Sequence, residues 1–155
     1  MKSTMREVLE AIRTTLRAVD GSGSYTYDLS DTADRVHVGA PPTQPAVVPS
    51  VWIHSATMQG SQGQGTPLGM YRREFGCMIA GYVGAADDSP GARVLAAADL
   101  ADDIHRALES NRSLSGHVLD LTVTSAPING EDLGLPGLGF VGAELSAYWR
   151  VETGV

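Results

Sequence analysis

The sequence predicts an α+β domain in which two α-helices pack on one face of a mainly antiparallel β-sheet, with long Gly/Pro-rich loops between the elements. Apolar residues recur at helical spacing within residues 5–19 and 92–110, and they alternate with other residues near the end of the chain. The 18 glycines and 8 prolines gather mostly between these segments. With 155 residues the chain can bury a core without a disulfide or a metal, so we expect one domain over residues 1–155.

The first helix is expected over residues 5–19. Thr4 and Glu7 have the spacing of a capping box, and the helical pattern stops at the Asp-Gly-Ser-Gly sequence of residues 20–23. The charged side of this helix indicates a solvated stripe with ion pairs one turn apart. Its apolar face consists of Met5, Val8, Leu9, Ile12, Leu16 and Val19, and its charged face of Arg6, Glu10, Arg13 and Arg17.

Strands are expected at five places, namely residues 36–38, 47–54, 70–83, 118–125 and 141–152. The third is apolar on both faces towards its end, so one face can pack against the helices while the other is free to meet a partner. The last alternates most cleanly and should have one wet face. Flexible loops are expected at about residues 20–35, 56–69 and 127–139.

The second helix is expected over residues 92–110, after an acidic turn whose Asp87 and Asp88 suit the positive end of the helix dipole. Its small buried face, with many alanines, allows close packing on a sheet. Helical spacing brings Asp99 and Asp103 together on the side opposite Ile104, which favours a solvated face over a hydrolytic or metal site.

Charge and hydropathy limit the classes of function. There are 11 Lys and Arg against 18 Asp and Glu, a net charge of -7 that disfavours a primary role in gripping nucleic acid. An acidic wall would instead let DNA slide past. No apolar run approaches the roughly 20 residues that span a bilayer, and the first residues lack the core of a secretory signal. Cys77 is the only cysteine, so no intrachain disulfide is possible and a reducing compartment fits.

The sequence offers no catalytic, cofactor or metal residues, so we do not expect an enzyme. The Gly-x-Gly-x-x-Gly letters of residues 137–142 open a strand rather than a helix, and Thr66 stands where a phosphate-binding loop needs lysine. Cys77 lies in an apolar strand as a buried small side chain. The scattered histidines make no metal-ligand pair; they are His37, His54, His105 and His117.

The order of parts resembles the tail terminator (tail completion) family of long-tailed bacteriophages and of related phage-derived particles. The resemblance rests on a Pro-rich approach to the strand at residues 45–54, a long polar loop, and the helix of residues 97–108. That helix runs directly into Ser113-Leu114-Ser115-Gly116-His117-Val118 and a strand, and the chain closes with the alternating Tyr148-Trp149-Arg150-Val151.

What the resemblance implies is a structural role in the virion, at the junction of tail and neck, after assembly in the host cytoplasm. Family members form hexameric rings on the head-proximal end of the tail tube, stop tube polymerisation and offer the surface that neck (head-completion) proteins bind. DNA passes through the ring without sequence-specific binding, and no membrane or cofactor takes part.

Two sets of contact residues are candidates. The uncharged stretch of residues 59–69 is expected to be mobile in the free subunit and to order against the tube or the neck protein. Its candidate docking residues are Gln59, Ser61, Gln62, Gln64, Thr66 and Leu68. Aromatic and Met side chains suit an interface core, although simple packing under a helix or loop is the alternative. These interface candidates are Trp52, Tyr71, Met78 and Tyr82.

Other functions remain open from the sequence. Another neck component, such as a head-closure or adaptor protein, or a tail-tube subunit is the nearest alternative, and polymerisation separates them because a tube subunit stacks indefinitely. A small intracellular ligand-binding module, with the Gly-rich loops as a lid, is the alternative from another class.

Overall fold

The computed structural model describes residues 4–31, 33–61, 70–85, 87, 89–135 and 137–152. Side chains of residues 61, 70, 71 and 150–152 fall outside that description, although their backbone belongs to strands. The elements in chain order are α1 (Met5–Arg17), β1 (Val36–Val38), β2 (Ser50–Ser61), β3 (Met70–Gly84), α2 (Pro90–Ser110), β4 (Asp120–Asn129), the 3-10 helix η1 (Gly130–Leu133) and β5 (Leu138–Glu152).

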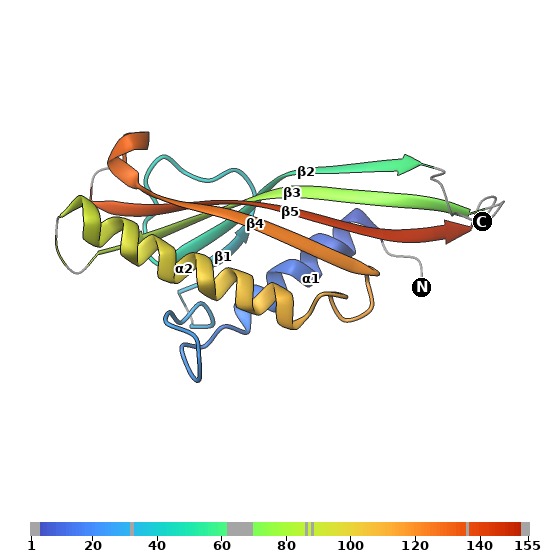
Figure 1. Cartoon of the computed structure of the whole chain (residues 1–155), viewed down its shortest axis with the longest axis horizontal. Coiled ribbons are helices and arrows are strands. Elements are labelled where there is room, and N and C mark those ends of the chain that lie inside the picture. The colour runs from blue at the N-terminus through green and yellow to red at the C-terminus, as the bar shows by residue number, and fades with distance from the viewer. Residues whose placement is uncertain are drawn as a thin grey trace.

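The strands form one sheet in the order β1-β2-β3-β5-β4. β1 runs parallel to β2, and all other neighbours are antiparallel. Both helices lie on one side of the sheet, with α2 nearest β4 and β5 and α1 nearest β1 (Figure 1). The predicted α+β fold is therefore confirmed, and the two edge strands, β1 and β4, are unlike each other in length and direction.

The main core lies between the helices and the sheet. The predicted capping box of α1 is present, with Thr4 and Glu7 each bonded to the other's backbone, and α1 buries Val8, Ile12 and Leu16. The alternation of β5 also holds as predicted, since Leu145 is buried while Glu144 and Ser146 are exposed. α2 begins earlier than predicted because Ser89 caps it and Pro90 occupies its first turn.

A second, smaller core covers the opposite face at one end of the sheet. The chain around residues 42–48 folds back over Ala80 and Tyr82 of β3, and Leu135 joins them from the η1–β5 connection. Tyr82 is only 3 % exposed and donates a 3.1 Å hydrogen bond to the backbone carbonyl of Pro42. Its own chain therefore covers the Tyr82 side chain, which is the alternative expected for this interface candidate, packing under a loop.

The predicted loop at residues 56–69 starts too early. β2 crosses a register shift between His54 and Thr57 and continues to Ser61, which pairs with Arg72. Gln59 therefore lies in the β2–β3 ladder opposite Glu74, and both Gln59 and Ser61 are strand residues rather than loop residues. The remaining docking candidates lie outside the described residues; they are Gln62, Gln64, Thr66 and Leu68.

Two other predicted boundaries need correction. The loop at residues 127–139 is shorter, because β4 continues to Asn129 and η1 follows it directly. Pro127 is accommodated there since β4 is an edge strand that pairs only with β5. The strand predicted at residues 118–125 consequently begins and ends later than expected, at Asp120 and Asn129.

Asp103 was wrongly placed on a solvated face of the second helix. Its side chain is 1 % exposed and accepts hydrogen bonds from the backbone N–H groups of Thr26, at 3.0 Å, and Tyr27, at 2.8 Å. The segment that follows α1 crosses α2 here and covers the carboxylate. Asp99 is exposed, as predicted, and Asp102 is exposed as well.

Candidate functional site

The described part of the chain has no cluster of three or more His, Cys, Asp or Glu side chains able to hold a metal ion. Within the same residues, no helix has both the length and the apolar character needed to cross a bilayer. Burial raises the pKa of the Cys77 thiol to about 12, so the thiol stays protonated and is a poor nucleophile at neutral pH.

One contact that sequence reasoning missed has the order of a serine–histidine–carboxylate triad. His105 Nε2 lies 2.8 Å from Ser125 Oγ, and His105 Nδ1 lies 3.4 Å from Glu109 Oε1. The carboxylate contact is long and Glu109 is solvent-exposed, so it holds the imidazole only loosely. Only the contact between His105 and Ser125 joins α2 to β4, because His105 and Glu109 both belong to α2.

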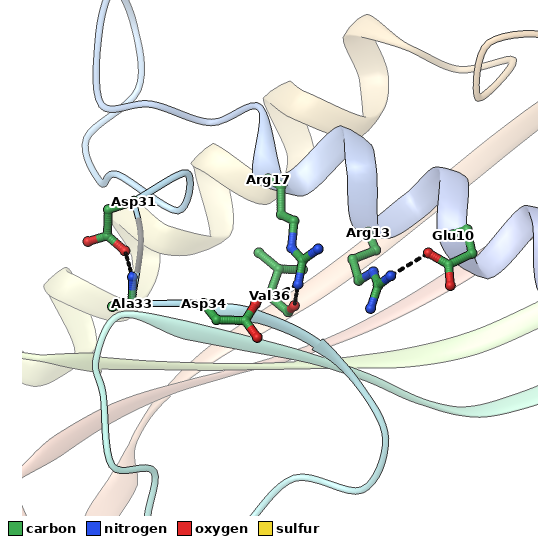
Figure 2. A network of polar contacts seen from close by, with 7 residues as sticks. All are labelled: Glu10, Arg13, Arg17, Asp31, Ala33, Asp34 and Val36. Carbon is green, nitrogen blue, oxygen red and sulfur yellow. Dashed lines mark hydrogen bonds and ion pairs between the residues drawn. The ribbon is translucent and has the colours of Figure 1, made fainter.

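The two edges of the sheet are the more informative surfaces. At the β1 edge, Arg17 of α1 reaches across to Asp34, at 2.5 Å, and to the backbone carbonyl of Val36, at 3.1 Å (Figure 2). Arg17 therefore occupies an acceptor of the edge strand, while the next outward residue, Val38, remains exposed. In the same view, Arg13 pairs with Glu10 along the helix surface, as the charged stripe predicted.

Beside this edge, on the face away from the helices, lies a recess of about 510 Å³, which we call the β1-edge pocket. His37 and Trp52 stack in its wall with ring centroids 4.1 Å apart. Ser50 Oγ and Trp52 Nε1 are buried without any hydrogen-bond partner among the described residues. The full lining is Ala33, Asp34, His37, Pro42, Gln44, Pro45, Ala46, Val47, Ser50 and Trp52.

At the opposite edge, η1 forms a corner between β4 and β5, which we call the η1 corner (Gly130–Leu133). Leu133 is 51 % exposed there. Glu131 forms an ion pair with the buried Arg93 of α2, whereas Asp132 has no ion pair or hydrogen bond with the described residues. Leu119, just before β4, is exposed as well.

The open face of the sheet carries a third surface, a polar groove of about 440 Å³ across β2, β3, β5 and β4. The Arg72 guanidinium carbon lies 4.2 Å from the centre of the Tyr148 ring, and Arg72 Nε lies 3.2 Å from Glu74 Oε1. Glu144 lines the same groove and has no partner among the described side chains. The groove is thus a mixed-charge surface with surplus carboxylate.

The predicted interface residues do not form one cluster. Trp52 lies half-buried in the β1-edge pocket, while Met78 is exposed on the open face, where its strand pairs it with His54. Tyr71 pairs with Val151 in the sheet, and its side chain is outside the described set. The exposed Leu133 was missed because no periodic pattern marks a 3-10 corner.

Comparison with protein-family models and with curated proteins finds no match for this chain.

Proposed function

We propose that the chain is a structural virion protein that forms a closed ring on the head-proximal end of a phage tail tube. The ring stops tube polymerisation and provides the surface for head–tail joining. Two observations support this function: the sequence resembles tail terminators, and the sheet has two unlike edges.

The unlike edges carry the proposal. A ring of identical subunits needs a heterologous contact, in which one patch of each copy meets a different patch of the next. The β1 edge and the β4 edge lie on opposite sides of one sheet, and each has exposed apolar residues, Val38 and Val47 on one side and Leu119 and Leu133 on the other. Two different patches on opposite sides are what a head-to-tail ring requires.

Charge supports the same function. The net charge of -7, together with the Glu144 carboxylate on the open face, which has no partner among the described residues, suits a ring through which DNA passes without sticking. The partners proposed are therefore a second copy of the chain, the tube protein and a neck protein, with DNA only in transit.

The β2–β3 hairpin is the proposed contact with the tube or neck. The ladder from Gln59 to Ser61 pairs with Arg72 to Glu74, and residues 62–69 connect these two strands in the sequence. Replacing residues 62–69 by a short Gly-Ser linker should leave folded protein that no longer caps tubes. Tails of normal length with this variant would overturn the docking assignment while leaving the ring itself untouched.

Electron microscopy of the protein, alone and mixed with tube subunits, tests the function. Single closed rings at tube ends, together with tubes that stop growing, are expected. Open stacks of rings would instead favour the tail-tube alternative, and a ring that binds only a neck protein would favour a head-closure or adaptor role.

A small-ligand-binding module is the second candidate, because a groove of about 520 Å³ with a largely apolar lining lies between α1 and the end of α2. Tyr25, Ala107 and Asn111 are among its lining residues. Native mass spectrometry of freshly purified protein would reveal a retained small molecule if this candidate holds.

A further inference from the structure

We infer that the η1 corner of one copy docks into the β1-edge pocket of the next. This inference rests on the proposed ring and names the contact that closes it: the Leu133 side chain enters the apolar rim of the pocket, and the Asp132 carboxylate accepts hydrogen bonds from its unpaired donors.

Two residues in the lining of the β1-edge pocket, Ser50 and Trp52, carry buried donors that lack an acceptor. Ser50 is 2 % exposed and its hydroxyl has no partner among the described residues. Trp52 is half-buried, but its Nε1 atom is buried and has no partner among the same residues. A buried donor that stays unpaired destabilises the folded subunit, so an acceptor supplied by another chain removes a penalty that the single subunit carries. Pro42, Pro45 and Val47 add an apolar rim beside these donors.

The η1 corner offers the complementary groups. Leu133 is half-exposed, and the Asp132 carboxylate next to it has no ion pair or hydrogen bond with the part of the chain that the structure describes. The corner is also held in place before binding: Asn129 accepts a hydrogen bond from the Glu131 N–H, Glu131 pairs with the buried Arg93, and Leu135 N–H donates to Gly130 at 2.7 Å. A fixed corner loses little conformational freedom on binding.

The two patches lie at the same end of the sheet. One row of register runs Ser50–Tyr82–Phe140–Ile128 from β2 to β4, so the pocket and the end of β4 are level across the strands. The small core under both, made by Ala80, Tyr82 and Leu135, packs against Val48 as well. A copy placed beside another, with little shift along the strands, therefore brings corner and pocket together.

The contact also explains why exposed apolar groups remain at both places. The neighbouring copy would cover Leu133 at one edge and the apolar rim with Val47 at the other. In an open row of subunits, the two end copies would each keep one of these patches exposed. When the ring closes, both apolar patches of every copy are covered by its neighbours.

Cysteine crosslinking tests the contact. The variants Leu133→Cys and Val47→Cys are made separately and mixed, and a short bismaleimide is added at a concentration where the wild type forms rings. Cys77 does not interfere because its thiol is buried and protonated. Leu95→Cys, mixed with Val47→Cys, is the matched control, since Leu95 is 68 % exposed on α2 and is even more accessible than Leu133.

The expected result is a crosslinked dimer in the mixture of Leu133→Cys and Val47→Cys, in at least tenfold excess over the control mixture and over either variant alone. If rings form but this pair links no better than the control, the docking contact is wrong and the proposed function stands. If the wild type stays monomeric at every concentration, alone and with tube subunits, the proposed function itself fails.

Ser50→Ala provides a second readout that a merely structural role would not give. Removing an unpaired buried hydroxyl should leave the subunit as stable as the wild type or slightly more stable, whereas it should weaken self-association about tenfold, as loss of a hydrogen bond to a carboxylate does. Sedimentation velocity and urea unfolding measure the two quantities on the same protein. Self-association unchanged by both Ser50→Ala and Leu133→Asp would overturn the contact.

Discussion

The Arg17 guanidinium donates a 3.1 Å hydrogen bond to the backbone carbonyl of Val36, on the outer side of edge strand β1. An exposed strand edge is a template for uncontrolled pairing with other chains, and a charged side chain laid across it prevents this. The cover is limited to the start of β1, because Val38 is exposed. The start of this edge is thus blocked to an added strand, while the neighbouring pocket stays open.

Arg17→Met should therefore raise non-specific aggregation. The variant keeps the apolar stem and removes the donor to Val36 and the ion pair to Asp34, so the free energy of unfolding should fall by only about 0.5–1 kcal/mol. Light scattering at increasing protein concentration measures the aggregation. Arg13→Met is the control, since among the described residues Arg13 pairs only with Glu10 on its own helix. Equal aggregation of both variants would contradict the role of Arg17 in covering the edge.

Asp103→Ala should be strongly destabilising. The buried carboxylate accepts backbone hydrogen bonds from Thr26 and Tyr27, and its loss leaves both N–H groups without their acceptor, which costs about 2–4 kcal/mol. Asp103→Asn keeps one acceptor oxygen and should lose less. Urea unfolding measures the change, with the exposed neighbour Asp102→Ala expected within about 0.5 kcal/mol of the wild type. A similar loss of unfolding free energy in the Asp102 and Asp103 variants would show that the hydrogen bonds of Asp103 do not stabilise the fold.

Gly139→Ala should disrupt the packing of α2 on β5. A Cβ at this position would lie 2.4 Å from the backbone carbonyl oxygen of Arg93 and 3.2 Å from the Ala97 Cβ, so backbone has to move. Overpacking of this kind costs about 1–3 kcal/mol, visible as a lower thermal midpoint. Gly91→Ala has open space and should be neutral; a fully stable Gly139→Ala protein would contradict the close approach.

The ion pair between Arg112 and Asp120 should be visible in a pH titration. Hydrogen bonding from Arg112 holds the pKa of the Asp120 carboxyl below its ordinary value of 3.8. A carboxyl whose pKa is lowered by folding stabilises the fold above the unfolded value, and this contribution disappears as the pH falls through the folded value. In Arg112→Met the NMR-detected midpoint of Asp120 should move upward. A midpoint unchanged by the substitution would show that the pair does not persist in solution.

Local patterns predicted the elements well. The Thr4–Glu7 capping box and the alternation along β5 depend on neighbouring residues only, and both are present as expected. The strand nature of Gln59 was missed for a related reason: the register shift after His54 interrupts the alternation, and polar residues on an open face look like a loop.

The sequence could not show which side chains are covered by segments that lie far away along the chain. Helical periodicity assigns Asp103 to a face, but only the fold shows that the chain near Thr26 crosses that face. Likewise, Tyr82 has the parity of an open-face residue, and the segment around Pro42 covers it. The β1-edge pocket and the η1 corner depend on the same kind of distant contact, so Trp52 alone among the candidates pointed towards them.

Negative-stain imaging of purified protein mixed with tail-tube subunits tests the central claim most directly. Closed rings of fixed subunit number, one at the end of each tube, together with tubes that grow no further, are the predicted result. Particles that remain single subunits at high concentration, with tubes that elongate as if the protein were not there, would contradict it.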